Sequence, residues 1–80
     1  MSLEETDKKL VYMVNQIATF FAHQPDDVAI EEIAAHIRKF WEKRMREKII
    51  ALAARDAHGI SPRALAAVSQ LAHTPPVKAN

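Results

Sequence analysis

The sequence has no cysteine and only one glycine among its 80 residues. Without cysteine the chain can form no disulfide and offers no thiolate as a metal ligand or nucleophile. A single glycine is too few for a glycine-rich loop whose backbone wraps a phosphate. The four prolines, at positions 25, 62, 75 and 76, leave long stretches free of helix breakers. These absences exclude disulfide scaffolds and phosphate-loop enzymes, and they favour helices.

Long apolar runs and an excess of one charge are also missing. No apolar run approaches the ~20 residues of a membrane span, and the N-terminal "MSLEETDKK" lacks the apolar segment of a secretory signal. The 11 basic and 10 acidic residues nearly cancel, for a net charge of +1. We therefore expect a cytoplasmic protein that binds neither membranes nor, given so weak a field, nucleic acid.

Residue patterns typical of catalysis or metal binding are absent too. The chain has no Ser-His-Asp arrangement, and no two of its histidines lie three or four positions apart, as two metal ligands on one helical face do. The histidines are His23, His36, His58 and His73. The paired carboxylates Asp26 and Asp27 fall at an expected helix N-terminus, where negative charge is favoured. We expect no catalytic residue, metal site or bound cofactor.

The apolar residues recur with the period of an α-helix. In the first segment they are Leu10, Met13, Val14, Ile17, Phe20 and Phe21. Gly59 is placed to end a third helix, and Ser61 with Pro62 to begin a fourth. The pattern predicts an all-α fold, a small bundle of three to four helices at about 6–23, 27–41, 43–57 and 61–73. We expect residues 1–74 to form one domain and residues 75–80 a flexible tail.

The second apolar stripe leaves one ambiguity. It runs through Ile37 and Trp41 and continues without a phase break through Met45 and Ile49. One continuous helix from about 28 to 57 would be roughly 45 Å long. A bend near residues 41–43 would instead let the second half fold back onto the core, and both arrangements stay open. The expected core anchors are Phe20, Phe21, Ile37, Trp41 and Met45.

The segment "HIRKFWEKRMREK", residues 36–48, carries six basic side chains around an adjacent Phe-Trp pair. On one helix Lys39, Lys43 and Arg46 would share a face, as a nucleic-acid-binding helix requires. Glu42 and Glu47 dilute that charge and can form weak ion pairs along the helix. Aromatic residues, Met and Arg are the types enriched in protein interfaces, which favours a docking surface.

Two blocks of the sequence carry a family resemblance. "KLVYMVNQIATFF" followed by "IAAHIRKFWEKRMREKII" resembles the delta subunit of NAD-dependent, molybdenum-containing formate dehydrogenases. The resemblance implies a small helical accessory subunit without redox centres or an active site of its own. It would bind and stabilise the molybdenum catalytic subunit and assist its cofactor loading. The residues that we expect to contact that partner are His36, Lys39, Phe40, Arg44 and Arg46.

One position departs from the family pattern. After the Phe-Trp pair the family usually has an acidic residue and then a proline, which together favour a helix break. This chain has Glu42 and Lys43 there. The family resemblance therefore implies a helix break at this point, although this chain lacks the proline that would favour it. The alternative functions are a small helical nucleic-acid-binding or regulatory domain and, given the thin core, a self-associating bundle.

Overall fold

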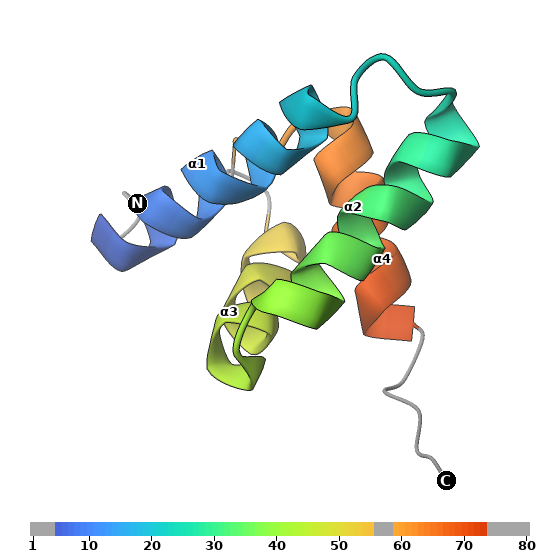
Figure 1. Cartoon of the computed structure of the whole chain (residues 1–80). Coiled ribbons are helices and arrows are strands. Elements are labelled where there is room, and N and C mark those ends of the chain that lie inside the picture. Colours follow the sequence, from blue (N-terminus) through green and yellow to red (C-terminus); the bar gives the residue numbers. More distant parts are fainter. Residues whose placement is uncertain (1–4, 56–58, 74–80) are drawn as a thin grey trace, which may run out of the picture.

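The computed structural model describes residues 5–55 and 59–73, and within these ranges all regular structure is helical. The four helices are α1 (Glu5–Phe20), α2 (Asp26–Phe40), α3 (Lys43–Ala53) and α4 (Pro62–His73) (Figure 1). The predicted all-α fold is confirmed. The expected tail at 75–80 lies outside the described residues.

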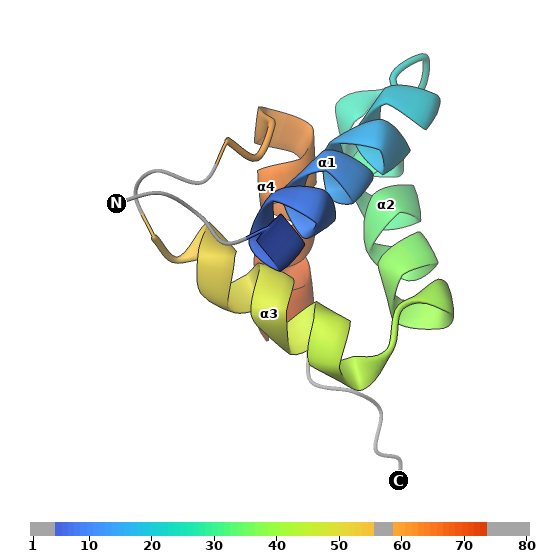
Figure 2. The ribbon, with the colours of Figure 1, turned by 90° about the vertical axis from the view of Figure 1, so that its left-hand side faces the viewer.

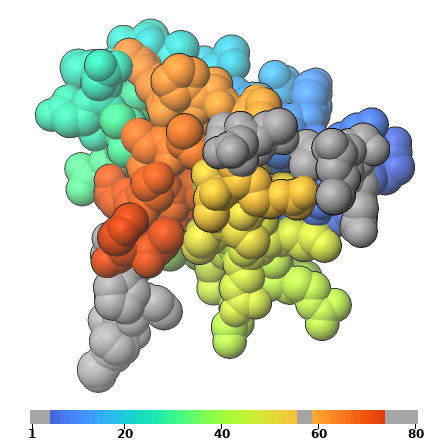
Figure 3. Space-filling view, turned by 180° about the vertical axis from the view of Figure 1, so that it is seen from behind, coloured from blue at the N-terminus to red at the C-terminus, as the bar shows by residue number. Residues whose placement is uncertain are grey.

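The helices pack around α4, which contacts each of the other three. Its most extensive contact is with α2, and α1 lies across both (Figures 1 and 2). The third helix packs on α4 and α1, and from behind it is seen beside α4 on the surface (Figure 3). Although α2 and α3 are neighbours in sequence, each therefore buries its apolar face mainly against α1 and α4.

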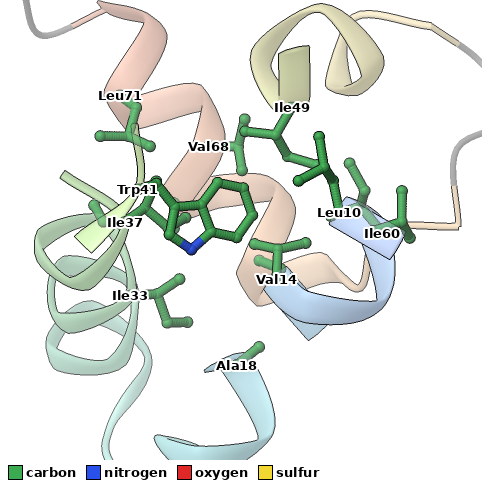
Figure 4. Close-up of a cluster of buried hydrophobic side chains, with 14 of the residues drawn as sticks. Leu10, Val14, Ala18, Ile33, Ile37, Trp41, Ile49, Ile60, Val68 and Leu71 are labelled. Carbon is green, nitrogen blue, oxygen red and sulfur yellow. The ribbon is translucent and has the colours of Figure 1, made fainter. Parts of the chain in front are cut away.

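The core lies where these faces meet (Figure 4). Its largest fully buried side chains are Val14, Ile33, Ile37, Ile49 and Val68. Trp41 is 5% exposed, and its indole ring lies among Ile37, Val68 and Val14. Burial of so large a ring in a thin core concentrates much of the apolar contact area at one residue.

The helix is interrupted between α2 and α3, and this interruption resolves the ambiguity of the second apolar stripe. Trp41 and Glu42 have ψ angles of 140° and 157°, which are extended and not helical. The last α2 bond runs from the Trp41 N–H to the Ile37 carbonyl, and the first α3 bond from the Arg46 N–H to the Glu42 carbonyl. The predicted bend is confirmed, and the continuous helix is wrong. The break lets Ile49 reach the core, whereas a straight helix would carry it past α1 and α4.

Two details of the helix ends differ from expectation. Helix α1 ends at Phe20, short of the predicted residue 23. Helix α3 ends at Ala53 with Ala54 as its C-cap, so the prediction that Gly59 caps it is wrong. Gly59 instead takes a φ of 77° in the connection to α4, a left-handed conformation that glycine adopts without strain. Helix α4 begins at Pro62 as predicted.

The side chain of Asn15 in α1 forms hydrogen bonds to the connection that leads into α4. The Asn15 side-chain amide donates to the Gly59 carbonyl at 3.0 Å, and its carbonyl oxygen accepts from the Ser61 N–H at 2.9 Å. These two bonds join residues that are more than forty positions apart in the chain. Asn15 therefore fixes where α4 starts relative to α1.

Two charged contacts also join helices. Arg63 at the start of α4 binds the Asp26 carboxylate at 2.7 Å and donates to the Ala22 carbonyl at 3.0 Å. Asp7 of α1 is buried, with its carboxylate 3.7 Å from Nζ of Lys48 in α3. The first contact ties α4 to the α1–α2 connection, and the second ties α1 to α3.

Candidate functional site

The helix break divides the aromatic and basic segment into two parts. His36, Lys39 and Phe40 belong to the last turns of α2, whereas Arg44 and Arg46 belong to the start of α3. Trp41, between them, points into the core and is removed from the surface. The predicted contact residues therefore do not form one helical face.

The three α2 residues do lie together. The His36 and Phe40 rings are one helical turn apart, with centroids 4.7 Å from each other. Nζ of Lys39 lies 5.6 Å from the centroid of the Phe40 ring, a cation–π contact worth about 0.5–1 kcal/mol at an exposed site. Phe40 nevertheless remains 66% exposed. The structure thus presents a large aromatic ring to solvent beside a positive charge.

A groove runs beside His36, between α1 and α2. We call it the α1–α2 groove, and it is lined by Gln16, Ile17, Phe20, Phe21 and His36. Its volume is about 260 Å³ and its walls are almost entirely carbon. Because His36 lines the groove and also contacts Phe40, the groove and the exposed Phe40 ring form one continuous surface.

Phe20 is on this surface and not in the core. It is 73% exposed, so its prediction as a core anchor is wrong. Adjacent helical residues point about 100° apart, and here Phe21 takes the inward direction and packs partly against the core. Phe20 lines the groove, with its ring perpendicular to that of Phe21 and the two ring centroids 5.0 Å apart. The sequence already indicated that one phenylalanine would be exposed, because so small a core cannot bury every phenylalanine side chain.

The remaining predicted anchors lie at or near the core. Ile37 and Trp41 are buried, and Met45 is partly buried against the same cluster. Among the predicted anchors, Phe20 alone points away from the core.

The two arginines of α3 face different directions, as positions two apart on a helix must. Arg44 is exposed beside Glu42, Lys43 and Glu47. Arg46 is partly buried, and its Nη1 donates to the Trp41 carbonyl at 2.6 Å. That carbonyl lies at the break, where helical bonding stops. Arg46 therefore holds the turn between α2 and α3, and the geometry leaves Arg44 as the arginine free to meet a partner.

This difference predicts that replacing Arg46 lowers the stability of the fold much more than replacing Arg44. Arg46→Ala removes a charged hydrogen bond and should lower the free energy of unfolding by about 1.5–3 kcal/mol. Arg44→Ala should change it by less than about 0.5 kcal/mol, because Arg44 is exposed. Urea unfolding of the full chain, followed by circular dichroism, measures both. Equal stability of the two variants would contradict the role of Arg46 in the turn.

The basic stripe predicted for a nucleic-acid-binding helix is interrupted. Lys39 lies on α2, whereas Lys43 and Arg46 lie on α3 beyond the break. Lys43 also pairs with Glu47 at 3.8 Å, and Arg46 is engaged with the Trp41 carbonyl. Without a continuous helix these cations do not follow one face.

Within residues 5–55 and 59–73, no three His, Asp or Glu side chains come together as a metal-binding group. No helix in these ranges combines the length and apolar character needed to cross a membrane.

Comparison with known protein families bears directly on this surface. The family model described as NADH-dependent formate dehydrogenase delta subunit, FdsD, matches residues 9–68. The chain belongs to this family. The match runs from the second turn of α1 into α4, so it includes the α1–α2 groove, the α2–α3 break and the exposed Phe40. No curated protein and no solved structure matches the chain. Membership of the delta-subunit family makes the chain a component of a formate dehydrogenase complex.

Proposed function

We propose that this delta subunit is a non-catalytic subunit that docks on the molybdenum catalytic subunit of its formate dehydrogenase and stabilises it. The surface that docks consists of the α1–α2 groove, Phe40, Lys39 and Arg44. The observation that carries the proposal is the exposure of Phe20 and Phe40 on either side of His36, in a chain of this family.

The cost of exposing these rings supports a docking role. Burying one aromatic side chain is worth about 1.5–3 kcal/mol, so a surface with two exposed rings gains that free energy only when something covers it. Contiguous apolar surface of this kind marks interaction sites in soluble proteins. Lys39 beside the Phe40 ring and the exposed Arg44 at the start of α3 are the cations that we assign to the charged rim of the interface.

Stabilisation of the partner follows from docking by mass action. A ligand that binds only the folded state of its partner raises that partner's stability, by about 2.7 kcal/mol at a concentration of 100 Kd. If the delta subunit holds the catalytic subunit folded before its molybdenum cofactor enters, the same binding assists cofactor loading.

Coexpression of the catalytic subunit with and without this chain tests the proposal. We expect the two to copurify, and we expect the catalytic subunit to have a higher melting temperature and molybdenum content when the chain is present. Phe40→Ala should weaken copurification about ten-fold or more, whereas Glu31→Ala, at an exposed position in the second turn of α2, should not. A catalytic subunit with unchanged stability and molybdenum content would refute the proposal.

A further inference from the structure

We infer that the α1–α2 groove receives one apolar side chain from a segment of the catalytic subunit, and that this segment carries a carboxylate close to that side chain. The inference rests on the proposed function and adds to it the site of insertion and the chemistry of the inserted segment. The walls of the groove, its rim and the charge around it each support this inference.

The walls of the groove are apolar and already in place. Ile17 and Phe21 form part of them and also pack against the core, so the core fixes their positions. Phe20 stands perpendicular to Phe21 at 5.0 Å and forms an exposed wall. An apolar pocket whose walls are held by the core loses little conformational entropy when it is filled. It therefore suits one apolar side chain better than a charged or polar group.

The rim of the groove offers hydrogen bonds suited to a peptide. Gln16 is exposed on the groove, and its amide has one donor group and one acceptor group. A peptide backbone presents the matching pair, a carbonyl and an N–H. No hydrogen bond within the described ranges engages the Gln16 side chain, so both groups face solvent until a partner arrives. A polypeptide segment therefore fits the rim as well as the walls.

The charge around the groove selects an acidic segment. No carboxylate lines the groove, and the adjoining last turn of α2 carries Arg38 and Lys39. Nζ of Lys39 lies 5.6 Å from the centroid of the Phe40 ring, and that ring contacts His36 on the groove wall. A carboxylate beside the inserted apolar side chain would meet this cation. Two symmetric copies of this chain would offer each other the same surface, without a carboxylate in the groove, so a second copy fits less well.

Binding of the full chain to the catalytic subunit tests the groove itself. Phe20→Ala should weaken the affinity about ten-fold or more, because Phe20 forms an exposed wall of the groove. Tyr12→Ala is the matched control: Tyr12 is 64% exposed on the same helix but does not line the groove. It should change the affinity less than about two-fold. Titration calorimetry measures both variants, and circular dichroism checks that both are folded.

A charge reversal tests the acidic character of the segment. Lys39→Glu should weaken binding about five-fold or more at low salt, and the loss should shrink as salt rises. Lys8→Glu, which makes the same change at an exposed position near the start of α1, should have little effect. Equal effects of the two reversals would show that only net charge matters and would overturn the assignment of Lys39.

A photocrosslinking amino acid in place of Gln16 identifies the occupant. We expect a crosslink to a catalytic-subunit peptide that has an apolar side chain and an Asp or Glu within about one helical turn. Crosslinks to a peptide without a carboxylate, or to a second copy of this chain, would overturn the inference. If the wild-type chain fails to bind the catalytic subunit, the proposed function fails. If it binds and Phe20→Ala binds equally well, only the groove inference fails.

Discussion

Replacement of Trp41 by alanine is expected to lower the free energy of unfolding by about 3–5 kcal/mol. The indole is 5% exposed and packs among residues from α1, α2 and α4, so its removal leaves a cavity that no single helix can close. A domain of 80 residues has a total stability of roughly 4–12 kcal/mol. The loss therefore approaches the whole stability of the fold, and we expect the variant to be largely unfolded near body temperature.

The measurement needs a probe other than tryptophan fluorescence, because Trp41 is the only tryptophan in the chain. Far-ultraviolet circular dichroism during urea unfolding measures the loss of helix in the wild-type chain and in the Trp41→Ala variant. Trp41→Phe is the matched control, since it retains an aromatic ring and should cost less than half as much. Phe40→Ala, next in sequence but exposed, should have a small effect. Similar losses at positions 40 and 41 would contradict the inward orientation of Trp41.

Replacement of Asn15 by alanine is the second large effect, with an expected loss of about 2–4 kcal/mol. The variant loses two hydrogen bonds, to the Gly59 carbonyl and from the Ser61 N–H, and it leaves the partly buried Ser61 N–H without its acceptor. Each neutral bond contributes about 1 kcal/mol, and an unsatisfied buried group costs about 1–3 kcal/mol. The damage should be concentrated at the start of α4.

Native-state hydrogen exchange locates this damage. Amides in the first turns of α4 should exchange faster in Asn15→Ala than in the wild-type chain, relative to amides in the middle of α2. Asn15→Asp separates the two bonds, because a carboxylate still accepts from Ser61 but cannot donate to Gly59. We expect it to be intermediate in stability. A uniform loss of protection in all four helices would instead indicate that Asn15 acts on the whole fold.

Much of the candidate docking surface follows from the sequence, within one helix. His36 and Phe40 lie four residues apart, so their contact is dictated by the helical period alone. The position of Lys39 beside them follows for the same reason. The groove does not follow, because its walls come from α1 as well as α2 and depend on how those helices lie side by side. The role of Arg46 also could not be read from its position, since its acceptor carbonyl becomes free only where the helix breaks.

The sequence by itself determined the helical class of the fold, most of the residues that each helix turns inward and the family to which the chain belongs. Periodicity fixes the direction of each side chain around its own helix axis, and the segments around Asn15 and Phe40 carry the family pattern. Only the tertiary structure decided the break after Trp41, the outward position of Phe20 and the groove beside His36. The physical reason is that these features depend on competition for one small core. The turn after Trp41 lets both Trp41 and Ile49 lie in the core, and at the end of α1 it is Phe21 and not Phe20 that packs against this core.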